Sequence, residues 1–173
     1  MQIEERSYRK ITVDDLKKLK DLALRERIEF FDREPRYRKA YWDSLIAIAL
    51  CQGAALHFID SRTGVKDFDI WYFYIKSYEV TYPYRALKSV DSRLEEFGVH
   101  PDDVAKRYRG RRVHLMGRTI DSYIVKRNNG DPRNCIIKYL EGGRTKTSRA
   151  LAKKAVVGLW PDAILGKVIW SRN

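Results

Sequence analysis

Two acidic residues, Asp67 and Asp69, stand at the start of an apolar run that extends to Ile75. Alternate residues of a strand point to the same face, so the two carboxylates are expected side by side, with Cα atoms about 6–7 Å apart. At about 5 Å and an effective dielectric of 20, two like charges repel by roughly 3 kcal/mol. A divalent cation would offset this repulsion, because hard cations bind carboxylate oxygens. The alternative is a solvent-facing acidic pair bridged to Lys66 or Arg62.

A second apolar run, Leu45–Cys51, precedes a turn at Gln52-Gly53-Ala54. Its length and the glycine after it favour a buried strand, although periodicity alone does not distinguish a short strand from a helix end. A short helix is expected to follow, over 54–59. Backbone N–H groups at Gly53 and Ala54 would then open this helix and receive phosphate oxygens. A tight turn that binds nothing is the alternative for Gly53.

This order of strand, glycine turn, spacer and Asp-x-Asp strand over residues 45–75 resembles the nucleotidyltransferase family of the polymerase-beta-like superfamily. The resemblance extends to about residue 118 if Arg112–Arg118 is the strand that brings a third carboxylate. It implies Mg²⁺-dependent transfer of a nucleotidyl group from a nucleoside triphosphate to a hydroxyl acceptor. Its implied catalytic residues, which also hold the metal, are Asp67 and Asp69. Its implied nucleotide-binding residues are Gly53, Ala54, Lys66 and Arg112.

Two positions depart from the family pattern. Ala54 stands where the family has a serine that contacts phosphate, and His114 stands where the third acid is expected. His114 is therefore a further candidate metal ligand. The departures also motivate an alternative function, a catalytically inactive module of this fold that binds nucleic acid or a protein partner. Small nucleotidyltransferases also resemble the toxin halves of toxin–antitoxin pairs, which extends the same alternative.

Composition limits the classes of partner. The 173 residues carry a net charge of +12, which suits contact with nucleic acid, nucleotides or an acidic protein. No run of 18 apolar residues predicts a membrane span, and the polar start of the chain lacks a signal-peptide core, so we expect a cytoplasmic protein without a membrane partner. Cys51 and Cys135 lie in apolar contexts and are expected to be buried free thiols.

The remaining N-terminal elements are expected to surround these strands. Thr12 is expected to cap an amphipathic helix over 13–33, and a helical turn follows over 36–43. The arginines of this region, Arg27 among them, are expected to form a solvated face with neighbouring glutamates. Ser89 is expected to cap a helix over 90–97. The strand over 113–116 is expected to run beside the two acids.

The C-terminal part is expected to be helical. Helices are predicted from Pro132 to Gly142, from Thr147 or Ser148 to Gly158, and again from Pro161, with a basic outer face. The predicted fold class is therefore α+β, a small central mixed β-sheet of nucleotidyltransferase type flanked by helices. Residues 1–125 form the core with its N-terminal helix, and residues 126–173 form a helical segment packed on it, together one compact unit.

Overall fold

The computed structural model describes residues 8–83, 89–91 and 112–172. Its helices and strands, in chain order, are α1 (Val13–Arg33), α2 (Pro35–Tyr41), β1 (Leu45–Cys51), α3 (Gln52–Asp60), β2 (Phe68–Ile75), β3 (Ser89–Asp91), β4 (Arg112–Ile120), α6 (Ser122–Arg127), α7 (Pro132–Gly142), α8 (Lys146–Ala152), β5 (Ala155–Trp160), the 3₁₀ turn η2 (Asp162–Ile164) and β6 (Val168–Ser171). None of the helices in these ranges is long and apolar enough to cross a membrane.

The described strands form one six-stranded sheet in the order β3-β4-β2-β1-β5-β6. β2 and β4 are parallel, and every other neighbouring pair is antiparallel. The predicted α+β class with a central mixed sheet is thus confirmed. β2 lies inside the sheet and is almost entirely buried, as its apolar sequence predicts for a strand covered on both faces.

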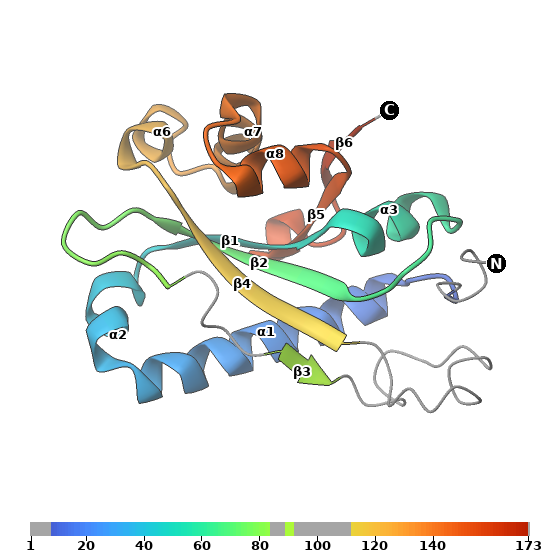
Figure 1. The fold of residues 1–173 in the computed structure, drawn as a ribbon, viewed down its shortest axis with the longest axis horizontal. Helices are drawn as coiled ribbons and strands as arrows, with labels where there is room; N and C mark the ends of the chain where they lie inside the picture. The colour runs from blue at the N-terminus through green and yellow to red at the C-terminus, as the bar shows by residue number, and fades with distance from the viewer. Residues whose placement is uncertain (1–7, 84–88, 92–111, 173) are drawn as a thin grey trace.

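Helices cover the sheet on two faces (Figure 1). Helix α1 lies across one face, and α6, α7 and α8 lie over the other. Successive side chains of β1 point to opposite faces of the sheet and so pack into both layers. Ile48 and Leu50 join the core beneath α1, and Ala47 and Ala49 join the core beneath α7 and α8. The small side chains on the second face let those helices pack closely on the strand.

Helix α1 begins and packs as its sequence predicts, with one exception. The Thr12 hydroxyl accepts from the Asp15 backbone N–H, and the Asp15 carboxylate accepts in turn from the Thr12 backbone N–H. This capping box satisfies two backbone donors at the helix start. Arg27 is buried rather than solvated, because its guanidinium donates to the Tyr74 hydroxyl and lies 4.9 Å from the centre of the Trp42 ring. It attaches α1 to β2 through aromatic contacts.

The prediction of a helical C-terminal segment is wrong for most of residues 147–171. After α7, which ends at Gly142 as predicted, α8 starts earlier than expected, with Thr145 as its cap, and stops at Ala152. The next apolar run forms strand β5 beside β1, and the last forms β6. β5 is a strand and not a helix because its β-branched valines favour extended backbone and alternate between the two faces of the sheet. Val157 faces the α1 layer, whereas Val156 faces the α7 layer. The segment therefore adds two strands, β5 and β6, to the described sheet and is not only a helical cover.

Two other expectations change. The strand expected over 113–116 continues to Ile120 as β4. The helix expected over 90–97 does not begin at Ser89, because Ser89–Asp91 pair with β4 as strand β3. Antiparallel ladder bonds to β4 satisfy these backbone groups in place of a first helical turn. The rest of that expected helix lies outside the described residues.

Candidate functional site

Three side chains on neighbouring strands meet in one row across the sheet. The antiparallel β1–β2 register sets Cys51 opposite Asp69, and the parallel β2–β4 register sets His114 opposite Asp69 on the other side. Residues directly opposite each other in a sheet share a face. Asp69 therefore lies between the last residue of β1 and a histidine of β4. β4 is thus the strand that the sequence predicted to run beside the acids.

The end of β1 turns sharply at Gln52 into α3. Cys51 is extended, whereas Gln52 has a φ of +61°, the left-handed region that a residue with a Cβ rarely adopts. A Cβ on Gly53 would lie 3.4 Å from the carbonyl oxygen of Gly64, an ordinary van der Waals contact, so the turn brings the start of α3 against the loop at Gly64. Gly53 and Ala54 occupy the first turn of α3, two and three residues beyond Cys51. The glycine turn and Asp69 are thus at the same edge of the sheet.

His114 and Asp69 form a polar pair at this edge. The imidazole Nδ1 lies 3.3 Å from the carboxylate Oδ1, and the two side chains remain 32% and 21% exposed. This partial exposure leaves the pair within reach of a ligand.

Burial has the largest effect on the pKa of the Asp69 carboxyl. It raises the pKa of Asp69, and the negative charge of Asp67 raises it further, while His114 and Lys154 act in the opposite direction. The net effect is a raised pKa, which means that the surroundings disfavour the ionised form of Asp69 relative to its protonated form. Burial, with the charge of Asp69, also raises the pKa of the Cys51 thiol, which makes that cysteine a poor nucleophile.

Asp67 precedes β2 and is half-buried. Its electrostatic effect on Asp69 agrees with the predicted closeness of the two acids. The loop before it is held by α3: the Asp60 carboxylate accepts from the Thr63 backbone N–H and hydroxyl, and a ring nitrogen of the buried His57 lies 2.6 Å from the Thr63 carbonyl oxygen. These bonds hold the loop between α3 and β2, and this loop places Asp67 at the edge of the sheet.

The donor set at this edge suits an ion that completes its shell elsewhere. Among residues 8–83, 89–91 and 112–172, no group of three or more His, Cys, Asp and Glu side chains is placed to hold a metal ion. Mg²⁺, however, is usually held by one or two carboxylates together with substrate phosphates and water rather than by an all-protein cage. A partly exposed carboxyl with a raised pKa next to a second acid fits that kind of site.

The other predicted site residues are less closely tied to the acids. Lys66 is exposed in the loop before Asp67, and the Ala54 side chain is buried within α3, which leaves only its backbone for a ligand. Arg112 opens β4 two residues before His114, but its side chain lies outside the described part of the structure. Sequence reasoning missed the nearness of Lys154, which directly precedes β5 and whose charge acts on Asp69. No local signal could place it there, because β5 was predicted as helix.

Comparisons of the chain with protein-family models, with curated proteins and with solved structures gave no significant match. The chain is therefore assigned to no family by similarity. Its function has to be argued from the geometry of the Asp69 edge and from the charge of the surrounding surface.

Proposed function

We propose that this chain is a nucleotidyltransferase-type enzyme, which transfers a nucleotidyl group from a nucleoside triphosphate to a hydroxyl acceptor. The observation that carries the proposal is the position of Asp69. It lies beside the end of β1, where the chain turns into α3, and beside the parallel strand β4. This order, with the acid at the mouth of a glycine turn, is the arrangement that the resemblance over residues 45–75 implies.

Each residue at the edge has a role in this reaction. The backbone N–H groups of Gly53 and Ala54, in the first turn of α3, bind phosphate oxygens of the triphosphate. Asp67 and Asp69 would hold Mg²⁺, which supplies charge neutralisation at the phosphates when it is bound. Lys66 adds an exposed positive charge on the same loop. Lys154 opposes the negative potential of the two acids.

The chemical step is an in-line displacement at the α-phosphorus. The acceptor hydroxyl oxygen forms the new bond to phosphorus and releases its proton to water, while the bond to the bridging oxygen breaks and pyrophosphate leaves. This chain contributes mainly position and charge, since phosphoryl-type transfers depend on orientation and electrostatic stabilisation. His114, paired with Asp69, orients that carboxylate.

Calorimetry with each nucleoside triphosphate in the presence of Mg²⁺ tests the proposal. The wild-type chain should bind at least one triphosphate, and Asp69→Asn and Asp67→Asn should each lose that binding. Asp43→Asn is the matched control, because Asp43 is an exposed carboxylate just before the opposite end of β1. A wild-type chain that binds no triphosphate, or acidic variants that bind as well as the wild type, would overturn the enzyme proposal.

A second candidate function is an inactive module of the same type that binds nucleic acid or a protein partner. Two observations favour it: Ala54 offers no hydroxyl, and His114 occupies the position opposite Asp69. The basic charge suits polyanions without any metal. In this case nucleic-acid affinity should fall as salt rises and should weaken when Lys153 and Lys154 are neutralised, while Asp69→Asn should leave it unchanged.

A further inference from the structure

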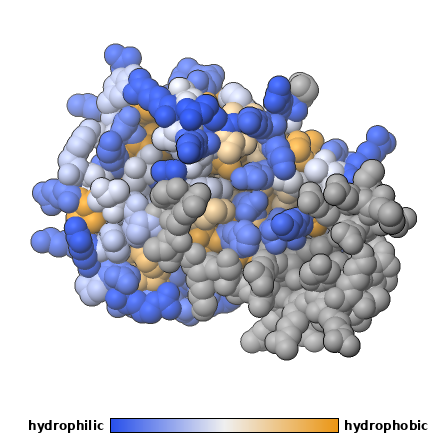
Figure 2. Space-filling model, in the orientation of Figure 1, coloured by the Kyte–Doolittle hydropathy of each residue, from blue (hydrophilic) through white to orange (hydrophobic). Residues whose placement is uncertain are grey.

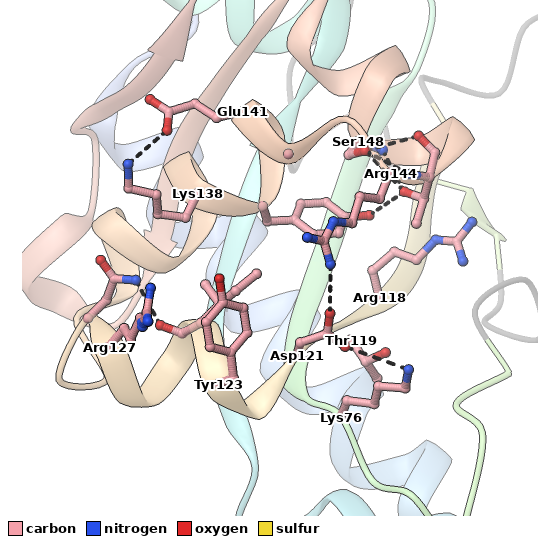
Figure 3. Close-up of a pocket in the computed structure, with 15 residues that line it drawn as sticks. Lys76, Arg118, Thr119, Asp121, Tyr123, Arg127, Lys138, Glu141, Arg144 and Ser148 are labelled. Carbon is pink, nitrogen blue, oxygen red and sulfur yellow. Dashed lines mark hydrogen bonds and ion pairs between the residues drawn. The ribbon is translucent and has the colours of Figure 1, made fainter.

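A cavity of about 730 Å³ lies away from the Asp69 edge, between the C-terminal end of β4 and helices α6, α7 and α8 (Figure 3). Its size falls within the range of small-molecule sites. Arg118 of β4 lines it, four residues beyond His114 on the same face of the strand. At about 3.3 Å per residue, the cavity and the His114 position are separated by about 13 Å along β4.

Positive charge dominates the lining of this cavity. Five of its residues are cationic and only two, Asp121 and Glu141, are acidic. The cationic ones are Lys76, Arg118, Arg127, Lys138 and Arg144. They come from five separate places in the chain, including the end of β2 and the loop between α7 and α8. Such convergence of charge in a concave site favours an anionic ligand.

The two acids of the lining do not cancel this charge. Asp121 is shared, because its carboxylate lies 3.6 Å from the Lys76 ammonium and 4.0 Å from the Arg144 guanidinium. Glu141 pairs with Lys138 at 3.0 Å. Both arrangements are drawn in Figure 3, where Lys76 and Arg144 approach Asp121 from opposite sides. Salt bridges this exposed are weak, so these cations can turn to a stronger anion such as a phosphate.

An aromatic ring accompanies the cations. The Tyr123 side chain, on α6, remains 51% exposed, and the guanidinium carbon of Arg127 lies 5.1 Å from its ring centre. A ring and a guanidinium at the edge of a basic site form a surface on which a nucleobase can stack. In the orientation of Figure 2, the surface over α6, α7 and α8 is mainly hydrophilic.

The opposite wall of the cavity is already organised. The Tyr139 hydroxyl lies 3.0 Å from the Thr145 hydroxyl, which accepts from the Ser148 backbone N–H as the cap of α8. Arg118 donates to the buried Thr147 hydroxyl at 2.8 Å. These bonds join β4, α7 and α8, so the cavity keeps its shape without a ligand. Pre-organisation of this kind lowers the entropic cost of binding.

We propose that this cavity binds a nucleotide unit, with its phosphate held by the lining arginines and lysines and its base stacked on Tyr123. The unit comes either from a free mononucleotide or from a single strand of nucleic acid, which share this chemistry. The inference goes beyond the proposed transfer reaction, because it concerns a separate site and needs neither Asp67 nor Asp69.

The test measures binding with EDTA present, so that a site that needs a divalent metal does not contribute to the signal. One arm uses fluorescence anisotropy with a labelled ten-nucleotide single-stranded RNA, and the other uses calorimetry with AMP. Tyr123→Ala should weaken binding about 5- to 150-fold, the range that base stacking on an aromatic side chain supplies. Tyr123→Phe should retain it. Binding in the RNA arm alone identifies the strand as the source, and binding of AMP identifies the free nucleotide.

Two variants that remove the same charge distinguish binding in the cavity from non-specific electrostatic attraction of the ligand to the basic surface. Arg127→Ala and Arg133→Ala remove the same charge from exposed positions, but only Arg127 lines the cavity. Arg127→Ala should therefore weaken binding more, and Glu141→Gln, which releases Lys138, should strengthen it. Equal effects of the two arginine variants, an unaffected Tyr123→Ala, or no binding in either arm would overturn the inference. Asp69→Asn should leave this binding intact, so the two proposals fail separately.

Discussion

The imidazole Nδ1 of His114 lies 3.3 Å from the carboxylate oxygen Oδ1 of Asp69, across the parallel strands β4 and β2. A histidine thus occupies the neighbouring position at which the resemblance, extended to about residue 118, expects a third acid. The pairing lowers the energetic cost of the buried Asp69 charge, although burial still leaves the pKa of Asp69 raised. His114 therefore helps to hold the Asp69 carboxylate in place.

His114→Asp should increase the affinity of the Asp69 edge for Mg²⁺. The change replaces the histidine by a third carboxylate beside Asp69 and Asp67, and each added acidic ligand attracts a hard cation. Without metal the same change should destabilise the fold, because like charges would then face each other across β2 and β4. Mg²⁺ titration followed by thermal unfolding measures both effects.

His114→Asn is the control, since it removes the imidazole without adding charge. It should show no gain in Mg²⁺ affinity. If His114→Asp binds Mg²⁺ no better than the wild type, His114 does not stand at a ligand position of a metal site.

Asp69→Asn should stabilise the fold at neutral pH. The pKa of Asp69 is raised in the folded state, mainly by burial. At neutral pH the ionised carboxylate therefore has a higher free energy in the folded chain than in the unfolded chain, which lowers the stability of the fold. This cost is present above the raised pKa and disappears as the pH falls through that pKa toward the unfolded value. The gain from asparagine should therefore be largest near pH 7 and shrink in acid. For a chain of this size, each kcal/mol gained raises Tm by about 2–4 °C.

Thermal unfolding from pH 7.5 down to pH 4 measures this dependence. Asp43→Asn, at an exposed carboxylate, should change Tm little at any pH. A lower Tm for Asp69→Asn at pH 7 would mean that the pairing with His114 outweighs burial.

The part of the sheet that carries the site could be predicted because its signals are local. The apolar runs around Gly53 have strand length, and the second begins with charged residues. The cap at Thr12 likewise depends on residues three apart. Patterns of this kind are contained in a few neighbouring residues, so sequence alone identifies them.

The parts that the sequence could not specify depend on partners distant in sequence. Val156 and Val157 follow a stretch rich in alanine and lysine, and only pairing with β1 makes their segment a strand. The distance between His114 and Asp69 depends on the register of two parallel strands, which no local pattern specifies. Lys154 could not be placed near Asp69 for the same reason, because its position follows from that of β5.

Gly158→Ala should destabilise the fold strongly. A Cβ on Gly158 would lie 2.2 Å from the carbonyl oxygen of Ile164, a backbone atom that cannot move without shifting η2. Overpacking of this kind costs about 1–3 kcal/mol or more. Urea unfolding measures the loss. Gly142→Ala is the matched control, because a Cβ there meets no atom within 4 Å, and alanine in place of a helical glycine should be neutral or stabilising.

Gln52→Gly should stabilise the turn that leads from β1 into α3. Gln52 has a φ of +61°, which costs a residue with a Cβ about 1–2 kcal/mol. Glycine removes this cost but loses about 0.5–1 kcal/mol of backbone entropy, so the net gain should lie between about 0 and 1.5 kcal/mol. Asparagine tolerates the left-handed region and should also help, whereas alanine retains the strain and should not.

Urea unfolding of the three Gln52 variants gives the order of stability, which should be glycine and asparagine above alanine. A Gln52→Gly chain less stable than Gln52→Ala would show that the left-handed turn is not under strain. Strained backbone is often retained where a site needs a fixed geometry. If the transfer reaction depends on the Gly53 amide, the more stable Gln52→Gly chain should bind the nucleoside triphosphate less tightly than the wild type, because the freed turn no longer holds that amide in one direction.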